Sequence, residues 1–340
     1  MFDVLGIGVA AVDDIVWVPE FPVPDTKSRI LRSVRDCGGL CATALVAAAR
    51  LGARCAYAGV LGRDEASEYV LRCLAADGID TSHVARDPSA APARSIIVID
   101  ASTGSRTVLS DSSGARRGDP DWPPEAVLTG TRVLLVDHVR MGASLRAARL
   151  ARAAGIPVVA DLERDDSSHF HELLSLVDHL VISHDFAARL TGLDDPERST
   201  AGLASSDRSV VVTCGADGSW YAGSTGMAGP ASGPLAGTVR RTGRKASGIA
   251  NGSAALIPAA PPAHHPAFDV DVVDTTGCGD VFHGAYAAGL AEGLELADRV
   301  RLASATAALA ATRPGGQAGI PSREEVDALL AAATGTATGG

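Results

Sequence analysis

A glycine-rich turn near the carboxyl end of the chain constrains the fold more than any other stretch. Residues 272–290 read VVDTTGCGDVFHGAYAAGL, where a short β-branched segment is followed by small and apolar residues at helical spacing. We expect a strand over residues 270–274, then a tight turn and a buried helix. Glycines at 277 and 279 let backbone N–H groups approach an anion, and the helix N-terminus adds its positive dipole end. The stretch therefore predicts a phosphate-binding turn.

Asp280 follows these glycines in the first turn of the expected helix. The helix dipole normally stabilises a carboxylate there, so an isolated Asp would mark only the start of a helix. Beside a bound phosphate, however, a carboxylate would repel the ligand. We therefore expect a chemical role, in which Asp280 takes a proton from an attacking hydroxyl while the turn holds the transferred phosphoryl group.

The motif DTTGCGD resembles the DTxGAGD motif of the PfkB, or ribokinase-like, carbohydrate kinases. The resemblance implies that Asp280 is the catalytic base and that Gly277, Cys278 and Gly279 form the anion hole. It also implies that Thr275, Gly277 and Gly279 contact ATP. Cys278 stands where the family usually has Ala. A thiol of lowered pKa at the helix N-terminus and a small buried filler are the two alternatives, and the filler is favoured.

Composition excludes several classes of protein. The chain has 340 residues, 46% of them hydrophobic, enough for one large α/β domain with a subsidiary element, or at most two domains. A net charge of −10 argues against nucleic acid and anionic membranes as partners. No apolar run reaches the roughly 18 residues of a membrane span, and the start lacks a basic signal region, so we expect a cytoplasmic protein. Six cysteines without a CxxC pair indicate neither a zinc site nor a disulfide framework.

Two acidic residues follow the first apolar run. Residues 4–12, VLGIGVAAV, predict a strand buried on both faces, which Asp13 and Asp14 would end. Parallel sheets bind ligands at the carboxyl ends of their strands. In the resembled family an Asp at this place holds the sugar, and the spacing from Gly8 favours Asp13. A strand-terminating turn is the alternative.

Two further segments, 13–35 and 94–117, alternate apolar and polar residues and predict a small β-sheet lid. The resemblance implies that the lid covers the sugar and that Arg106 and Ser110 reach it. An arginine at a strand edge is otherwise only a solvated charge. Lids of this family often pair, so we expect a homodimer formed through the lid.

Residues 37–52, CGGLCATALVAAARLG, resemble the family motif GGxxxNxAxxxARLG. Gly38 and Gly39 permit close approach of the backbone to a sugar. Thr43 takes the place of a sugar-binding Asn, and this shorter side chain leaves room for a different substrate.

Two cations suit an anionic substrate. Lys27 lies in the expected lid, and Arg140 follows the strand predicted over 132–137. Either alone would more often be a surface charge. Within the family the motifs are most similar to those of sulfofructose kinases, which implies that Lys27 and Arg140 hold a sulfonate. Ser110 stands where those enzymes have an asparagine.

The nucleotide side is indicated by two glycine-containing segments. Residues 209–218, SVVVTCGADG, resemble the family's VTxGxxG, which implies that Thr213, Gly215 and Gly218 contact ATP. The loop RPGGQAGIP includes Gly316 and borders the adenine in related kinases, often beside a monovalent cation such as K⁺. The family's Asn-x-x-Glu is replaced at Ser183 and Phe186, so the ligands of the expected Mg²⁺ are left open.

Together these features predict an α/β fold, a ribokinase-like three-layer α/β/α sandwich with a mostly parallel central sheet and a small β-sheet lid. The core would comprise residues 1–12, 36–93 and 118–333, with a flexible Gly/Ser/Pro-rich insertion at 222–266 and a disordered tail at 334–340. The expected reaction is transfer of the γ-phosphoryl group of ATP to a primary hydroxyl of a ketose. The leading candidate is 6-deoxy-6-sulfofructose, giving its 1-phosphate. A kinase of a non-sulfonated sugar, such as a ribokinase or fructokinase, and a catalytically silent sugar- or nucleotide-binding sensor are the alternatives.

Overall fold

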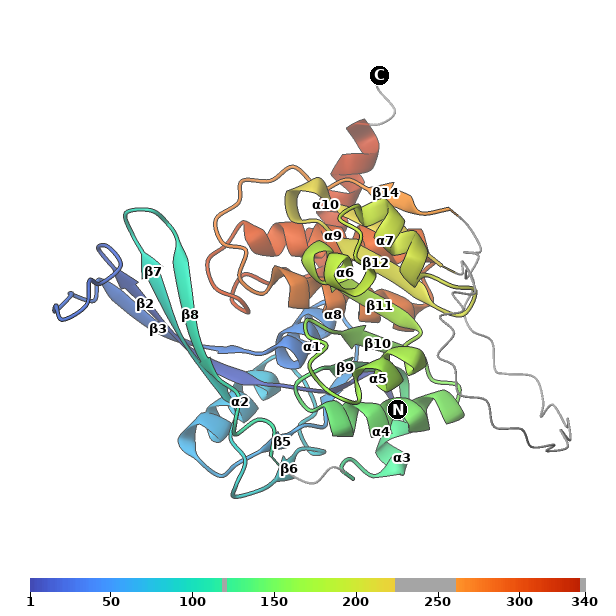
Figure 1. Cartoon of the computed structure of the whole chain (residues 1–340), viewed down its shortest axis with the longest axis horizontal. Coiled ribbons are helices and arrows are strands. Elements are labelled where there is room, and N and C mark those ends of the chain that lie inside the picture. The colour runs from blue at the N-terminus through green and yellow to red at the C-terminus, as the bar shows by residue number, and fades with distance from the viewer. Residues whose placement is uncertain (118–120, 224–260, 337–340) are drawn as a thin grey trace, which may run out of the picture.

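Eight strands form the central sheet within residues 1–117, 121–223 and 261–336, which the computed structural model describes (Figure 1). Six strands are parallel, and two antiparallel strands extend one edge. From that edge the order is β14 (Ala263–His265), β13 (Ser219–Ala222), β12 (Ser209–Thr213), β11 (His179–Ser183), β10 (Val158–Asp161), β9 (Thr131–Asp137), β1 (Phe2–Ile7) and β4 (Cys55–Tyr57). The mostly parallel sheet expected from the sequence is confirmed.

Helices cover both faces of this sheet, because successive residues of each buried strand point to opposite sides. In β9, Val133 and Leu135 pack with one set of helices, whereas Leu134 and Val136 pack with the other. The first set is α1 (Leu40–Arg50), α2 (Glu65–Ala76), α8 (Cys278–Glu292), α9 (Leu296–Ala311) and α10 (Arg323–Thr336). The second set is α3 (Glu125–Leu128), α4 (Met141–Ala153), α5 (Phe170–Leu176), α6 (His184–Thr191) and α7 (Pro196–Leu203). The three-layer sandwich is therefore confirmed.

A separate four-stranded sheet projects from the core as a lid (Figure 1). Its strands, in spatial order, are β3 (Arg32–Gly38), β2 (Ala11–Val18), β7 (Ala93–Asp100) and β8 (Arg106–Asp111). They begin and end a few residues away from the lid segments 13–35 and 94–117 expected from the sequence. A short parallel pair, β5 (Val60–Leu61) with β6 (Ala85–Arg86), lies near the base of the lid.

Two strands expected near the ligand differ from the prediction. The apolar run 4–12 is not one strand, because β1 ends at Ile7 and the chain enters the lid strand β2 at Ala11. The break falls at Gly8, where any Cβ would lie 2.1 Å from the Asp137 Oδ2. Asp13 therefore lies within a lid strand and does not end a core strand.

Residues 270–274 are also not a strand. They form an extended loop, in which the N–H groups of Val273 and Asp274 donate to the Ala311 carbonyl at the end of α9. Val272 and Val273 are both 62% exposed, so their β-branched side chains do not join a core layer.

The predicted insertion 222–266 is also corrected at its ends, since Ala222 completes β13 and Ala263–His265 form β14, which pairs with it. Helix α10 continues to Thr336, beyond the start of the predicted tail at 334. Residues 224–260 and 337–340 lie outside the described residues.

Candidate active site

The predicted phosphate-binding turn lies at the N-terminus of α8. Gly277 precedes the helix with φ 73°, a left-handed conformation that glycine adopts without strain. The Cys278 N–H donates to the Thr275 carbonyl at 3.3 Å. The next N–H groups at the start of a helix have no partner within it, so those of Gly279 and Asp280 are available to an anion. A Cβ built on Gly279 meets no atom within 4 Å, so open space lies beside the turn.

Carboxylates surround Asp280 in the first turn of α8. Burial raises its pKa well above the ordinary value, and the negative charges of Asp161, Glu163, Asp137 and Asp13 raise it further. The helix dipole, which the sequence indicated as the main influence, is outweighed. A carboxylate with a raised proton affinity is better suited to accept a proton near neutral pH.

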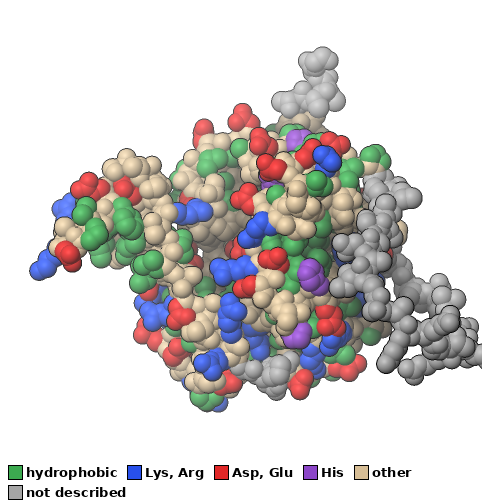
Figure 2. All heavy atoms as spheres, viewed as in Figure 1, with side chains coloured by type: hydrophobic (Ala, Val, Ile, Leu, Met, Phe, Trp, Pro, Cys, Tyr) green, Lys and Arg blue, Asp and Glu red, His purple; other side chains and the backbone are tan. Residues whose placement is uncertain are grey.

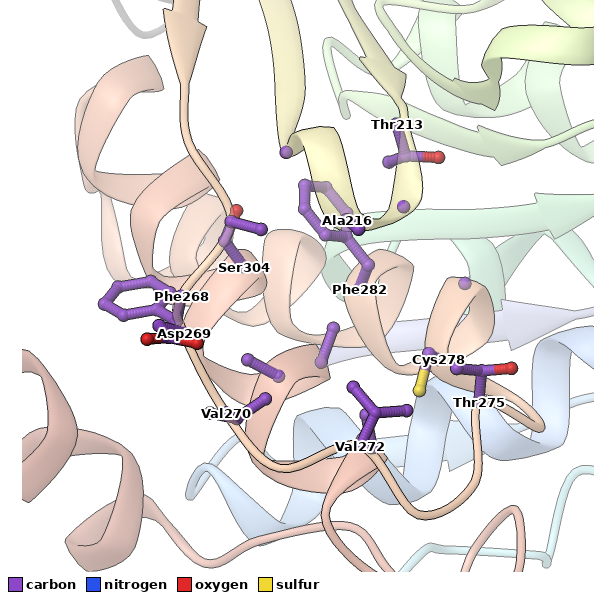
Figure 3. A pocket seen from close by; sticks show the side chains of 17 residues that line it. Thr213, Ala216, Phe268, Asp269, Val270, Val272, Thr275, Cys278, Phe282 and Ser304 are labelled. Carbon is purple, nitrogen blue, oxygen red and sulfur yellow. The ribbon is translucent and has the colours of Figure 1, made fainter.

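A cavity of about 610 Å³ opens beside the turn (Figure 3). The loop before α8 forms one wall with Phe268 and Val272, and Phe282 of α8 closes it from the helix side. Helix α9 contributes small side chains, so a flat, largely apolar space remains between the walls. The lining includes Thr213, Gly215, Gly218, Thr275, Cys278 and Gly279. These six residues, expected to contact ATP or the transferred phosphoryl group, are thus brought to one cavity large enough for a nucleotide.

Cys278 does not have the lowered pKa considered as an alternative. Burial raises the pKa of its thiol to about 11, and the charges of Asp274 and Asp280 act in the same direction. The thiol is therefore protonated at neutral pH. This agrees with the favoured role as a small filler, although its sulfur lies on the wall of the cavity (Figure 3).

The loop after α9 packs against the phosphate-binding turn. The carboxylate of Asp274 accepts from Thr276 N at 2.9 Å and from Gly315 N at 3.0 Å, which ties the turn to the loop. A Cβ on Gly277 would lie 3.5 Å from the Gly316 Cα. Gly316, expected to contact ATP, thus supports the turn and is absent from the residues that line the cavity.

Thr43 is buried beneath the same turn. Its hydroxyl accepts a hydrogen bond from the Gln317 Nε2 at 3.3 Å, and both side chains are almost fully buried. The Thr43 hydroxyl, expected to bind a sugar, therefore has a protein partner, and this bond links α1 to the loop after α9. Gln317 was not identified from the sequence, because nothing in the motif around it marks a partner 274 residues away.

A row of polar residues crosses the lid at Asp13. Strand register places Asp36, Asp13, Ser95 and Ser110 side by side on β3, β2, β7 and β8, so their side chains share one face of the sheet. Burial raises the pKa of Asp13, and a hydrogen bond from Ser95 partly opposes this effect. Asp36 and Ser95 were missed, because only the pairing of strands distant in sequence brings them to this row.

Asp14 lies on the opposite face of β2. Its carboxylate accepts from the Arg35 Nε at 2.8 Å, which holds its pKa below the usual range. Of the two adjacent acidic residues, Asp13 is therefore the one in the polar row, next to Asp36. A Cβ on Gly38 would lie 2.1 Å from the Asp13 Oδ2, so the glycine is required here. Gly39, with φ 96°, packs its backbone against Ala10 and begins α1.

Arg106 connects the lid to the phosphate-binding turn. From β8 its Nη1 lies 3.2 Å from the Thr276 Oγ1 and 3.4 Å from the Thr275 Oγ1, and 3.9 Å from the Asp274 Oδ1. Because residues at alternate positions share a face, Ser110 projects from β8 on the same side as Arg106. The lid face that carries the polar row therefore faces the turn.

The two predicted sulfonate ligands lie in different settings. Arg140 begins α4 at the end of the sheet and is 6% exposed. Lys27 is exposed in the loop between β2 and β3. This loop lies at the outer tip of the lid (Figure 1). The structure of one chain does not bring them together.

Among the described residues, no group of three or more His, Cys, Asp or Glu side chains is placed to hold a metal ion. Ser183 caps α6 by accepting from Phe186 N, and Phe186 is buried in the core. Neither contributes a ligand for Mg²⁺. None of the helices within the described part of the chain is both long and apolar enough to cross a membrane.

Comparison with known proteins agrees with this geometry. A family model described as pfkB family carbohydrate kinase matches residues 1–234 and 252–323. A ribokinase of Haemophilus influenzae is 27% identical over 332 residues, covering 94% of this chain and 95% of the relative. A 5-dehydro-2-deoxygluconokinase of Shouchella clausii is 21% identical over 349 residues, with 97% and 95% covered.

Solved structures share the architecture. A putative ribokinase from Agrobacterium tumefaciens superposes with a TM-score of 0.81 at 27% identity, covering 98% of this chain and 99% of the other. Arabidopsis thaliana ribokinase, solved with ribose and ATP, gives a TM-score of 0.77 at 21% identity, with 97% and 98% covered. At that identity the likeness shows the fold alone.

Proposed function

Because the chain belongs to the pfkB family of carbohydrate kinases and is an ATP-dependent sugar kinase, we propose that it phosphorylates a primary hydroxyl of a ketose. The observation that carries the proposal is that the turn leading to Asp280 lies between the cavity and the polar row of the lid. The cavity of about 610 Å³ lies on one side of the turn, and the polar row of the lid faces the turn from the other side. A nucleotide and a sugar can therefore meet at this carboxylate.

In the proposed reaction the substrate hydroxyl oxygen forms a bond to the γ-phosphorus of MgATP, and the bond from that phosphorus to the ADP oxygen breaks. Asp280 takes the hydroxyl proton. The N–H groups at the start of α8 stabilise the charge of the transferred group. Mg²⁺ enters with ATP as part of the substrate and neutralises phosphate charge, while Arg106 adds a positive charge from the lid when it covers the turn.

The leading substrate is 6-deoxy-6-sulfofructose, which would give its 1-phosphate. Arg140 supports this choice, because a buried guanidinium at the end of the sheet can bind a sulfonate with two parallel hydrogen bonds. The exposed position of Lys27 favours the second candidate, a kinase of a non-sulfonated ketose or pentose. The names of the curated relatives, ribokinase and 5-dehydro-2-deoxygluconokinase, favour it too.

A panel assay separates these candidates. ADP release is measured with 6-deoxy-6-sulfofructose, fructose and ribose, and the ratio of kcat/KM for the sulfonated over the plain ketose is compared among variants. We expect wild type to prefer the sulfonate. Arg140→Gln should lower the ratio about 10- to 100-fold, the usual loss for a charged hydrogen bond. Lys27→Ala tests the second cation, with Arg29→Ala in the same exposed loop as its control.

Equal turnover of fructose and the sulfonated sugar would refute the sulfonate assignment while retaining the kinase. Absence of turnover with every sugar, combined with a raised melting temperature on adding ATP or a sugar, would instead support a catalytically silent sensor. We also propose that a monovalent cation such as K⁺ binds beside the loop that includes Gly316. This is tested in the same assay by replacing K⁺ with tetramethylammonium. An unchanged rate would contradict it.

We also propose that the chain forms a homodimer through the lid. Apolar side chains gather on the lid surface (Figure 2), and Ile96 and Leu109, which pair across β7 and β8, are 49% and 58% exposed. All six residues of the edge strand β8 are exposed. An apolar face and an open edge of this kind are typical of a surface that another chain covers.

A further inference from the structure

His283 lies one turn after Asp280 on α8 and is only 6% exposed. Its Nδ1 is 2.8 Å from the Gly279 carbonyl oxygen, and its Nε2 is 2.8 Å from the Val181 carbonyl oxygen of β11. Both carbonyls can only accept hydrogen bonds. Neutral imidazole has one N–H and one lone pair, so it can satisfy one of these contacts but not both. The imidazolium ion satisfies both.

The negative charge that would pair with a positively charged His283 is that of Asp161, at the end of β10. Its Oδ2 lies 3.4 Å from the His283 Nδ1, and the two side chains are 7% and 8% exposed. This oxygen has no hydrogen-bond partner of good geometry among the described residues. An uncompensated carboxylate at such a depth would be strongly unfavourable, so a charged histidine next to it stabilises the pair.

Asp161 also acts electrostatically on the proposed base, Asp280, which lies one turn before His283 on α8. Among the charges that face Asp280, that of Asp161 has the largest effect on its proton affinity, ahead of those of Glu163, Asp137 and Asp13. Burial raises the pKa of Asp161; His283 has the largest opposing effect, Glu163 raises the pKa further and His138 lowers it. Burial disfavours the charged form of His138, which leaves His283 as the principal cation of this carboxylate group.

We propose that His283 is a positioning residue of the phosphoryl-transfer site, carrying a positive charge that neutralises Asp161 and so keeps Asp280 ionised and able to accept the substrate proton. The bond to the Val181 carbonyl of β11 also holds this end of α8 against the sheet. This role rests on the proposed function, because it assigns His283 to the proton transfer at Asp280.

The charge state can be measured without turnover. NMR of protein labelled with ¹⁵N in the histidine rings reports whether each ring nitrogen carries a proton, and His283→Gln assigns the resonance. We expect both nitrogens of His283 to be protonated at pH 7. A single protonated nitrogen, the mark of a neutral tautomer, would overturn the proposal.

The role is tested by the pH dependence of kcat, with whichever sugar of the panel wild type turns over fastest. Activity falls on the acidic side as Asp280 becomes protonated. His283→Gln leaves Asp161 uncompensated, so this acidic limb should move up by about one pH unit. Asp161→Asn removes the charge that repels the Asp280 carboxylate, so it should move the acidic limb to lower pH. The double variant removes both charges and should lie close to wild type.

His179→Gln is the matched control. His179 is half-buried on β11, and it contacts Tyr286 of α8, but desolvation lowers its pKa to about 3 and it is neutral. We expect the acidic limb of the kcat profile of His179→Gln to coincide with that of wild type. A His283→Gln variant that lost the same fraction of kcat at every pH would show a purely structural role and overturn the proposal. Absence of turnover by wild type would refute the proposed function itself, whatever charge state the NMR measurement finds.

Discussion

Burial and neighbouring carboxylates, rather than the helix dipole, determine the proton affinity of Asp280. A dipole near a half-buried carboxylate contributes up to about 2 kcal/mol at the N-terminus of a helix. The four carboxylates facing Asp280 act in the opposite direction within a low-dielectric site, and the result is a raised pKa. An aspartate carboxylate in water is a weak base. The raised pKa of Asp280 makes it better suited to accept the proton of the substrate hydroxyl.

Asp280→Asn should fold and bind ATP but lose about 10²- to 10⁴-fold in kcat, because it keeps the shape of the side chain and removes the proton acceptor. The measurement is ADP release, with ATP binding followed by calorimetry as the control for an intact site. Turnover within tenfold of wild type would contradict the assignment of the base.

Asp137 should make stability depend on pH. It is fully buried, and burial raises its pKa to about 7 although its carboxylate accepts from Val9 N and Val139 N. A carboxyl group whose pKa is raised on folding contributes stability below its unfolded pKa, near 4, and loses it as pH rises through 7. The loss from this group between pH 4 and 8 is at most about 4 kcal/mol.

The measurement is urea unfolding of wild type and Asp137→Asn across this pH range. The variant should be less stable at low pH, because its amide cannot accept from both backbone N–H groups. Its free energy of unfolding should also fall less steeply with pH than that of wild type. Parallel curves for the two proteins would show that Asp137 does not titrate in this window.

At the scale of elements, close packing of α8 on α1 positions the phosphate-binding turn. A Cβ on Gly284 would lie 1.9 Å from the Ala44 carbonyl oxygen, so the two helices touch through backbone. Any displacement of α8 would move Gly277 to Asp280 away from the cavity. The small residues of this helix are therefore needed for the geometry of the site as well as for packing.

Gly284→Ala should destabilise the protein by about 1–3 kcal/mol, since the collision outweighs the roughly 1 kcal/mol that Ala gains in helix propensity. Gly289→Ala on the same helix is the control, because its Cβ would meet only side-chain atoms, the nearest at 3.2 Å. Urea unfolding measures both. Equal stability of the two variants would contradict the role of the contact between α1 and α8.

At the scale of the whole molecule, one face of the lid carries the polar row toward the turn, and the other exposes apolar side chains. We expect wild type to sediment as a dimer and Leu109→Lys to sediment as a monomer, because a charge would be buried in the interface. Ala332→Lys, an exposed substitution on α10, is the control and should stay dimeric. A monomeric wild type at micromolar concentration would refute the lid interface.

Local patterns were sufficient to predict much of the fold and one side of the site. Buried apolar runs indicated the parallel strands, and DTTGCGD indicated the turn with its base. The prediction of a strand at 270–274 was wrong because β-branched residues also suit an extended loop, and only packing decides which of the two forms. Asp36, Ser95 and Gln317 were not found, since each acquires its role from partners distant in sequence.

The sequence by itself was sufficient to predict the turn, the start of α8 and the place of Asp280 in its first turn, because these features are neighbours along the chain. Tertiary structure decided the rest. It partly buried Asp280 and brought the charges of Asp161 and three other carboxylates to act on it, which changed a dipole-stabilised carboxylate into one of raised pKa. It also separated Lys27 from Arg140. Electrostatic effects act through space over a few ångströms in a low-dielectric interior, so only the folded arrangement of charges determines them.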